Sequence, residues 1–487
     1  MFSLSEIAAI TNGQVILSPS SVILSEAKNL KLRVNSAKDP EQDPLAFGLR
    51  VTGVSCDSRT IKPGDLFIPL KGDHFDGHSF LKEVFLKGAS AALSDHWVAI
   101  DHPIIVVKDT LKALQKLAQH YKKRFSVPTI AVTGSAGKTT TKECIGAALS
   151  NSFKIRVGVG NLNNHIGVPL NIFKLQPFDQ CAVFELGANH SGEIKLLSEI
   201  VQPSVGVITG ICPVHLEGFG SLERIYDAKL ELADYLNDQQ GTVIANGDDL
   251  DLKKRLQNRR FNLITFGKSH SCDYRISHLR TAENKILFNV NEKYHFQLKG
   301  YGLFNAPNAL AAIATAAHFK INLEALSQSW IELPRIQNRF IIDHWSSCNL
   351  LIVDDSYNAN PKSFEQAVES FKEIAKDRRK IIVVGDMLEL GEQSSFYHEL
   401  LGHFIAGQKI DALITVGSLS RFALNAFRKL NSKAVAIHFD KIEPACSYLT
   451  SNLREGDSVL IKGSHGVELF KIKPYLEEHF NITSASV

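Results

Sequence analysis

Short apolar runs alternate with longer helical segments over most of the chain. In the central part, four runs have the length and the continuous apolar character of buried strands, at residues 129–133, 182–185, 205–209 and 242–245. Segments long enough to form helices separate them. This alternation is typical of βαβ units, so the pattern predicts an α/β domain with a mainly parallel sheet.

The same alternation restarts after Leu333-Pro334, with strand-like runs at residues 350–353, 380–384, 412–416 and 458–461. It predicts a second, Rossmann-like α/β domain. Before the linker Val127-Pro128, shorter strand-like runs and turns precede a helical stretch at 111–124, which indicates a smaller α/β domain. We therefore expect three domains, at residues 1–126, 127–334 and 335–487. The polar stretch 18–49 interrupts the first domain and is expected to be a surface insertion.

Length and composition agree with a globular protein of several domains. The chain has 487 residues, of which 44% are hydrophobic and 22% are charged. At the usual domain size this length predicts roughly three domains, and the composition excludes a disordered, collagen-like or coiled-coil chain. The 54 Lys and Arg residues nearly balance the 51 Asp and Glu residues, for a net charge of +3. We therefore expect no nucleic-acid partner.

The cysteines and the apolar runs predict where the protein works. Its seven cysteines are scattered and include no Cys-x-x-Cys pair, which favours free thiols in a reducing compartment. The first residues show no signal-peptide pattern, and no uncharged apolar run reaches the ~20 residues of a membrane span. We expect a cytoplasmic protein without a membrane span, and a monomer.

The most specific motif is a phosphate-binding loop. An apolar strand at 130–133 runs into a glycine-containing turn, and a helix is expected to begin near Lys138. Such a turn points backbone N–H groups at phosphate oxygens, and the helix N-terminus adds positive potential. The common motif begins with a glycine where this chain has Val132, but a Lys-Thr-Thr-Thr run directly after a glycine favours nucleotide binding. The residues of the predicted loop are Thr133, Gly134, Ser135, Ala136, Gly137, Lys138, Thr139 and Thr140.

Acidic residues and a histidine follow the predicted central strands. Glu185 ends one strand, and His215 and Glu217 follow the next. In an open parallel sheet, ligands bind at the carboxyl ends of the strands. A carboxylate at the end of a buried strand is costly unless it holds a cation. Together with the phosphate loop, these residues predict a site for Mg²⁺ and ATP.

Four stretches carry a resemblance to a known family. They are the phosphate loop, the sequence GNLNNHIGVP at 160–169, the pair ELGANH at 185–190 and HLEGFG at 215–220, and the sequence DDSYNANP at 354–361. With these motifs the chain resembles the Mur ligase family, the ATP-dependent amide-bond ligases of peptidoglycan synthesis. The last three stretches are typical of the members that add D-alanyl-D-alanine. The resemblance extends from Asp57-Ser58-Arg59 to Lys462-Gly463-Ser464.

The resemblance implies a role for several residues around ATP. Lys138 and Thr139 would hold the ATP phosphates, and Arg339 would reach the γ-phosphate. Two Mg²⁺ ions would be bound by a set in which Lys229 matches the lysine that family members carbamylate; without the resemblance, Lys229 would be interpreted as an exposed helix lysine. The implied metal ligands are Thr139, Glu185, His215 and Lys229. The implied contacts on the nucleotide beyond the phosphates are Asn305, Asn308 and Asp355.

The resemblance also implies the substrates, UDP-N-acetylmuramoyl-tripeptide and D-alanyl-D-alanine. Residues expected to bind the UDP end are Ser58, Arg59 and Lys71, and those expected near the rest of the substrates are Asn163, Asn164, Asn358 and Asn360. Two positions depart from the family pattern. Phe304 replaces the usual histidine before Asn305, so it is expected either to stack on adenine or to pack in the fold. His465 replaces an arginine after Lys462-Gly463-Ser464, which removes one expected charged contact.

The expected reaction is ATP-dependent formation of an amide bond through an acyl phosphate, with no covalent enzyme nucleophile. Three alternatives remain open. Another Mur ligase or a folylpolyglutamate synthase would share the loop, although the chain has no Asp-Asn-Pro-Arg stretch and its loop reads Gly-Lys-Thr-Thr. A nucleotide-dependent switch or transport ATPase would hydrolyse ATP without a carboxylate acceptor. A binding module without activity would not need Lys138, Glu185, His215 and Lys229 together.

Overall fold

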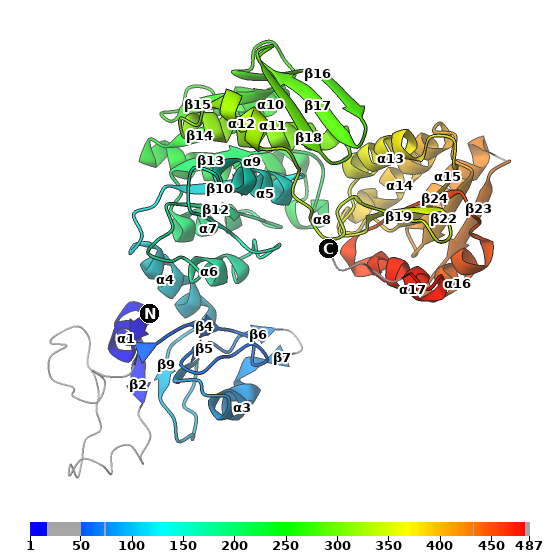
Figure 1. The fold of residues 1–487 in the computed structure, drawn as a ribbon. Coiled ribbons are helices and arrows are strands. Elements are labelled where there is room, and N and C mark those ends of the chain that lie inside the picture. Colours follow the sequence, from blue (N-terminus) through cyan, green and yellow to red (C-terminus); the bar gives the residue numbers. More distant parts are fainter. Residues whose placement is uncertain (17–49, 73–74, 432, 483–487) are drawn as a thin grey trace, which may run out of the picture. The chain divides into compact units, whose positions relative to one another are not determined.

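The computed structural model describes residues 1–16, 50–72, 75–431 and 433–482 (Figure 1). The expected insertion at 18–49 lies outside these residues. The chain divides into two compact units, of which the first contains Met1–Ala131, Phe153–Gly187 and Glu193–Ser204, and the second contains Val132–Ser152, Ala188–Gly192 and Val205–Val487. In the described part of the chain, no helix is both long and apolar enough to cross a membrane.

The first unit begins with a small five-stranded sheet in the order β2-β9-β8-β5-β4. Its helix α4 (Thr110–Lys122) starts where Asp109 accepts a hydrogen bond from the backbone N–H of Lys112, at 2.9 Å. Leu114, Leu117 and Tyr121 are buried at helical spacing along α4, so one face packs on the core. The elements are β1 (Phe2–Ser3), α1 (Leu4–Thr11), β2 (Gln14–Ile16), β3 (Arg50–Val51), β4 (Val54–Ser55), β5 (Leu66–Phe67), β6 (Lys71–Gly72), β7 (Phe75–Asp76), α3 (Leu81–Leu86), β8 (Ala91–Ser94) and β9 (Ile104–Val106).

The central sheet has nine strands in the order β11-β12-β10-β13-β14-β15-β16-β17-β18, and the division between the units runs through it. The pairs β11–β12, β13–β14, β14–β15 and β15–β16 are parallel, which confirms the predicted parallel sheet. The antiparallel extension β16-β17-β18 was not predicted from the sequence. The strands are β10 (Thr129–Thr133), β11 (Ile155–Val157), β12 (Cys181–Glu185), β13 (Val205–Ile208), β14 (Thr242–Asn246), β15 (Asn262–Gly267), β16 (Tyr274–Ala282), β17 (Lys285–Val290) and β18 (Tyr294–Lys299).

The helices that follow these strands complete the alternating pattern. They are α5 (Lys138–Leu149), α6 (Gly167–Ile172), α7 (Glu193–Val201), α8 (Leu216–Phe219), α9 (Leu222–Gln239), α10 (Leu250–Leu256), α11 (Ala306–His318) and α12 (Leu323–Ser329), with the 3₁₀ turn η3 (Leu303–Asn305) before α11.

The C-terminal part of the second unit is a six-stranded sheet in the order β19-β20-β24-β21-β22-β23. Strand β19 is antiparallel to β20, and all the other neighbouring strands of this sheet are parallel. This arrangement agrees with the predicted Rossmann-like domain. The elements are β19 (Ile341–Trp345), β20 (Leu350–Asp355), α13 (Pro361–Ala375), β21 (Arg379–Gly385), α14 (Ser394–Ala406), β22 (Ala412–Val416), α15 (Ser420–Leu430), β23 (Val435–Phe439), α16 (Ile442–Asn452), β24 (Asp457–Lys462) and α17 (Ile472–His479).

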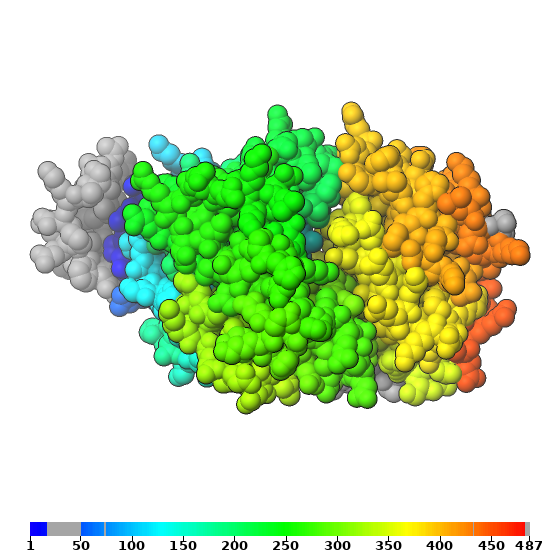
Figure 2. All heavy atoms as spheres, turned by 90° about the horizontal axis from the view of Figure 1, so that it is seen from above, coloured from blue at the N-terminus to red at the C-terminus, as the bar shows by residue number. Residues whose placement is uncertain are grey.

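Both faces of this sheet are buried, which explains its continuous apolar strands. Along β20, Leu351 and Val353 join one core cluster, whereas Leu350 and Ile352 join another. Helices α13, α14 and α15 supply the first cluster, and α16 and α17 supply the second (Figure 1). In the space-filling view, the atoms of this part, coloured yellow to red, form a continuous outer surface on the face shown (Figure 2). A strand covered on two faces carries apolar residues at every position.

Candidate functional site

The phosphate loop connects β10 to α5 with a backbone that requires glycine at two positions. Gly134 has φ of 142° and Gly137 has φ of 77°. A Cβ at Gly134 would overlap the hydroxyl of Thr209 and lie 3.0 Å from the carbonyl oxygen of Gly210. A Cβ at Gly137 would overlap the side-chain oxygen of Asn308. Glycine is therefore required at both positions by the positive φ and by the close approach of neighbouring residues.

The segment after β13 holds this loop in place. The backbone N–H of Ser135 donates to Gly210 at 2.9 Å, and its hydroxyl donates to the carbonyl of Cys212 at 2.9 Å. The Thr209 hydroxyl donates to the carbonyl of Ala136 at 2.6 Å. These bonds fix the turn before any ligand binds, so its N–H groups are preorganised.

Lys138 and Thr139 lie at the first turn of α5, as predicted. The ammonium of Lys138 lies across the loop, 3.0 Å from the carbonyl oxygen of Gly134 and 3.4 Å from that of Ser135. The side chain of Thr139 is buried, with 3% of its surface exposed. A lysine folded back over the turn and a buried hydroxyl are the groups that bind phosphates and Mg²⁺ in loops of this kind.

The two predicted adenine-side asparagines lie at the start of α11, and one of them reaches α5. The Thr141 hydroxyl donates to Oδ1 of Asn308 at 3.2 Å, and Nδ2 of Asn308 lies 3.5 Å from Oδ1 of Asn305. Asn305 donates to the carbonyl of Tyr301 at 2.9 Å. Phe304 packs edge-on against Phe340, with ring centroids 5.2 Å apart. The structure thus brings Asn308 to the phosphate loop and gives Phe304 a packing contact.

Glu185 lies at the end of β12 and is buried, with 4% of its surface exposed. Nδ2 of Asn163 donates to its Oε1 at 2.7 Å, so Asn163 orients the carboxylate. Asn164 has a different role, because its Oδ1 accepts the backbone N–H groups of Ile166 at 3.1 Å and Gly167 at 2.8 Å at the start of α6. Asn164 therefore stabilises a local turn.

Lys229 is buried in α9, with 1% of its surface exposed, so its interpretation as an exposed helix lysine is wrong. Its ammonium lies 3.2 Å from the carbonyl oxygen of Ala188 and 5.4 Å from the ring centroid of Phe219. His215 precedes α8 with φ of 51°, and its Nδ1 pairs with the carboxylate of Glu389. This hydrogen bond is the main reason why the pKa of Glu389 is lowered.

Taken one by one, these side chains offer donors of the kinds that bind divalent cations; Glu185 lies in the first unit, and Thr139, His215 and Lys229 lie in the second. Glu185 and Thr139 offer a carboxylate and a hydroxyl that are almost fully buried, and such hard oxygen donors suit this ion. His215 adds an imidazole, which Mg²⁺ prefers less. An ammonium cannot coordinate a cation, so Lys229 fits the set only as a carbamate.

In the C-terminal part, Arg339 and Asp355 are held by aromatic and charged neighbours. The guanidinium of Arg339 stacks over the ring of Tyr357, 4.2 Å from its centroid. Asp355 accepts the backbone N–H of Phe340 at 3.1 Å and pairs with the ammonium of Lys462 at 2.6 Å. Lys462 is buried, with 2% of its surface exposed. Lys462 was not predicted as part of the site. Its position directly after the apolar run at 458–461 is the sequence signal that could have indicated it.

The remaining polar residues of this segment bond mainly within the fold. Lys462 also donates to the carbonyl of Asn358 at 3.0 Å. Asn360 caps α13, because its side chain accepts the backbone N–H of Ser363 at 2.8 Å and the Ser363 hydroxyl accepts the N–H of Asn360 at 3.0 Å. His465 stacks on Phe470, with ring centroids 5.1 Å apart. Asn360 and His465 thus have structural contacts of their own.

The predicted UDP-side residues lie in the first unit and differ in exposure. Arg59 is exposed and pairs with Asp57 at 2.7 Å, whereas Ser58 is buried. Lys71 pairs with Asp95 at 2.6 Å. Burial works to raise the pKa of Asp95, but hydrogen bonds from Lys71 and from the following histidine outweigh it and lower that pKa to about 2. Both of these cations are thus paired with carboxylates of the same unit.

Comparison with known proteins finds three matching family models along the chain. The Mur ligase family catalytic domain matches residues 50–122, the Mur ligase middle domain matches 132–316, and the Mur ligase glutamate ligase domain matches 342–465. These ranges fall inside the three domains that the sequence predicts.

Curated relatives and solved structures extend the similarity to nearly the whole chain. UDP-N-acetylmuramoyl-tripeptide–D-alanyl-D-alanine ligase of Bacillus subtilis is 36% identical over 435 residues, covering 87% of this chain and 92% of the relative. The enzyme of that name from Escherichia coli is 32% identical over 439 residues, covering 88% and 95%. A crystal structure of MurF from Acinetobacter baumannii has a TM-score of 0.82 at 27% identity, covering 98% and 99%. MurF ligase from Thermotoga maritima in complex with ADP has a TM-score of 0.77 at 28% identity, covering 89% and 98%.

Proposed function

The chain belongs to the Mur ligase family, and we propose on this basis that it joins D-alanyl-D-alanine to UDP-N-acetylmuramoyl-tripeptide at the expense of ATP. The product is the UDP-linked pentapeptide precursor of peptidoglycan. One observation carries the proposal: relatives named for this reaction are similar over almost their whole length, in all three matched regions.

The reaction proceeds in two steps. The terminal carboxylate of the tripeptide attacks the γ-phosphorus of ATP, which forms an acyl phosphate and releases ADP. The amine of D-alanyl-D-alanine then attacks the acyl carbon, expels inorganic phosphate and loses a proton as the amide forms. Both steps place negative charge on oxygen atoms, so positioned cations and N–H groups supply most of the catalysis.

The phosphate loop and Lys138 hold the ATP phosphates in this proposal. The rigid turn presents its N–H groups, and the Lys138 ammonium already lies over the loop, 3.0 Å from the Gly134 carbonyl. Arg339 approaches the γ-phosphate from the C-terminal domain, where its stacking on Tyr357 limits the directions that its guanidinium can take. Asn305 and Asn308 contact the adenine side, and Asp355 contacts the nucleotide from the C-terminal domain.

Mg²⁺ would neutralise charge on the phosphates, and Thr139, Glu185, His215 and Lys229 would hold two such ions. The burial of Lys229 supports carbamylation. Burying an ammonium to 1% exposure carries a large desolvation cost. For a carbamate, attraction to the bound cations would offset the corresponding cost. Asn163 acts through Glu185, because its amide orients that carboxylate at 2.7 Å.

Substrate binding divides between the two ends of the chain. Ser58, Arg59 and Lys71 bind the UDP end in the domain at 1–126, and ATP binds in the domain at 127–334. Asn358 and Asn360 lie beside the dipeptide in the domain at 335–487, whereas Asn164 shapes the loop before α6. The protein acts as a monomer in the cytoplasm, where ATP and the UDP-linked substrate are available.

The test is phosphate release from ATP and Mg²⁺ with UDP-N-acetylmuramoyl-tripeptide, measured with and without D-alanyl-D-alanine. The proposal expects release only when both substrates are present, together with the UDP-pentapeptide mass in the product. Release without either substrate would indicate an ATPase of another class. Release that needs a different amino acid would keep the ligase chemistry and change the substrate.

A further inference from the structure

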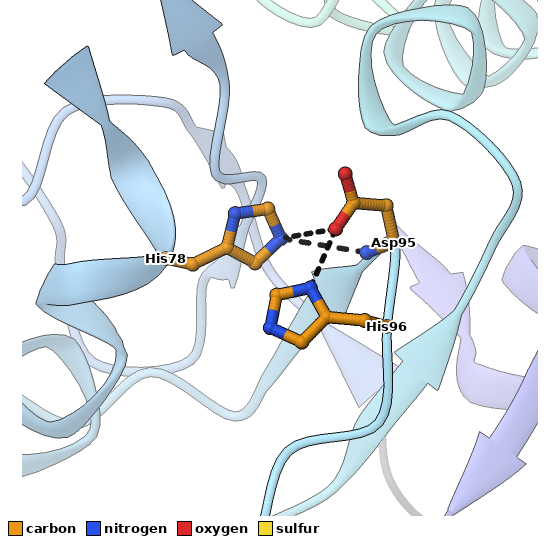
Figure 3. Close-up of side chains that lie close together, drawn as sticks. All are labelled: His78, Asp95 and His96. Carbon is orange, nitrogen blue, oxygen red and sulfur yellow. Dashed lines mark hydrogen bonds and ion pairs between the residues drawn. The ribbon is translucent and has the colours of Figure 1, made fainter. Parts of the chain in front are cut away.

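His78, Asp95 and His96 form a compact cluster in the first unit, and none of them is among the residues assigned above to ATP (Figure 3). His78 lies in the 3₁₀ helix Gly77–Phe80, and Asp95 and His96 directly follow β8. Each residue offers one potential ligand atom, and these atoms all lie within 4.8 Å of one another. The three side chains point toward a common centre from two separate loops.

We propose that this cluster is a binding site for a divalent transition-metal ion of the Zn²⁺ class, with His78, Asp95 and His96 as its ligands. Two imidazoles and one carboxylate are the donor set that such ions prefer, whereas Mg²⁺ and Ca²⁺ prefer oxygen donors alone. Three protein ligands would leave a fourth position open to solvent. None of the three ligands belongs to the proposed ATP site, although Asp95 pairs with Lys71, which is assigned to the UDP end of the substrate.

The distance between His78 and Asp95 suits a four-coordinate ion, whereas that between His96 and Asp95 must widen. With metal-ligand bonds of about 2.0–2.1 Å, neighbouring ligand atoms in a tetrahedral site are roughly 3.3–3.5 Å apart. Nε2 of His78 lies 3.4 Å from Oδ1 of Asp95. Nδ1 of His96 lies 2.6 Å from the same oxygen, which is a hydrogen-bond distance. A metal ion replaces the shared proton in that contact, and the pair then widens by less than 1 Å.

A second carboxylate orients His78 for this role. Nδ1 of His78 lies 2.6 Å from Oδ1 of Asp76, so that nitrogen carries the proton and donates it. The backbone N–H of Asp95 points at the other nitrogen, Nε2, at 3.4 Å, which shows that Nε2 is on the accepting side. A histidine that donates one nitrogen to a carboxylate and turns the other to the centre is the usual arrangement at protein metal sites.

The neighbouring charges leave one oxygen of Asp95 for the ion. Lys71 pairs with Oδ2 of Asp95 at 2.6 Å, while both histidine contacts are to Oδ1. Binding at Oδ1 thus leaves the Lys71 pair in place. The side chain of His78 is 7% exposed and that of His96 is 54% exposed, so the site has a fixed inner ligand and an accessible outer one.

Co²⁺ tests the proposal because it gives a visible absorption band whose intensity reports four-coordinate binding. The full-length protein is titrated with Co²⁺ in excess Mg²⁺ and ADP, which occupy the candidate ATP site, and Zn²⁺ is then added as a competitor. We expect one Co²⁺ per chain and displacement by Zn²⁺. Absence of the band in the unaltered protein would overturn the proposal.

Variants separate the cluster from other histidines. His96→Gln removes an exposed ligand with little risk to folding, and His78→Gln removes the inner one. Each should weaken Co²⁺ binding by at least about tenfold, and Asp76→Asn should weaken it by roughly 10- to 100-fold while keeping the helix cap. His102→Gln is the matched control, an exposed histidine of the same unit that packs on Phe85. Equal titrations of His96→Gln and His102→Gln would refute the assignment.

Discussion

The buried ion pair between Lys462 and Asp355 should carry a measurable part of the stability of the C-terminal domain. Lys462 has 2% of its side chain exposed and Asp355 has 15%, with 2.6 Å between their charged atoms. Replacing Lys462 by methionine keeps the side-chain length and removes the charge. Asp355 then loses its partner and keeps the N–H of Phe340, at 3.1 Å.

Breaking a buried pair costs about 3–5 kcal/mol when the remaining charge is fully enclosed. Because Asp355 is partly exposed and retains one hydrogen bond, we expect Lys462→Met to lower the free energy of unfolding by about 2–4 kcal/mol. The control is Lys471→Met, which breaks an exposed pair with Glu468 in the same domain, where the side chains are 53% and 50% exposed. Exposed pairs contribute about 0–1 kcal/mol.

Native-state hydrogen exchange of the amides in β20 and β24 measures the local effect, because both residues lie at the ends of these paired strands. Protection should fall by roughly 30- to 700-fold in Lys462→Met and by less than about sixfold in Lys471→Met. When Asp355→Asn is already present, adding Lys462→Met should lower the stability by less than Lys462→Met does in the unaltered protein. Equal losses of protection in Lys462→Met and Lys471→Met would refute the reasoning.

Four further predictions follow from individual side chains. Lys138→Ala should lower kcat by about 100-fold or more in the phosphate-release assay, while the exposed Lys154→Ala should leave it unchanged. Lys229→Ala should abolish ligation, and short-chain carboxylates should restore part of it; activity without them would exclude a role in metal binding. Asn360→Ala should lower the free energy of unfolding by about 1 kcal/mol in urea denaturation, and Asn360→Asp should restore it. Burial lowers the pKa of His398 below 6.5, so His398 binds a proton more readily in the unfolded chain than in the folded one. The free energy of unfolding should therefore fall as pH drops below 6.5, by at most about 1.4 kcal/mol per pH unit. A His398→Asn variant whose stability depends on pH in the same way would contradict this prediction.

The positions of the buried strands were predictable because such strands consist of continuous apolar residues. Residues 350–353 were predicted as a strand from pattern alone, and β20 (Leu350–Asp355) places alternate residues in two core clusters. The antiparallel strands β16, β17 and β18 were missed for a physical reason. In β17 every second residue is buried, and in β18 the buried residues Phe296 and Leu298 are also two positions apart. In β16 only Ile276 is buried. Such strands are not marked by a continuous run of buried apolar residues.

The phosphate loop was predictable because its chemistry depends on adjacent residues. Gly134 and Gly137 have the positive φ values that the motif requires, and Lys138 begins the helix. The partner of Lys462 could not be predicted, because Asp355 is 107 residues away in sequence. Contacts at such separation follow from the order of strands in the sheet, where β20 pairs with β24.

Burial distinguishes the polar residues that serve the fold from those that require a function. The side-chain oxygens of Asn164 and Asn360 accept hydrogen bonds from backbone N–H groups at helix starts. These bonds account for asparagine at both positions without any ligand. Glu185 and Lys229 are charged groups with 4% and 1% exposure, and their burial costs the fold free energy. A charge kept at that cost needs compensating partners, which Asn163 provides for Glu185 and the carbonyl of Ala188 provides for Lys229; in the proposed function, Mg²⁺ would add to these contacts. The case for a catalytic site therefore rests more strongly on these two residues than on the asparagines.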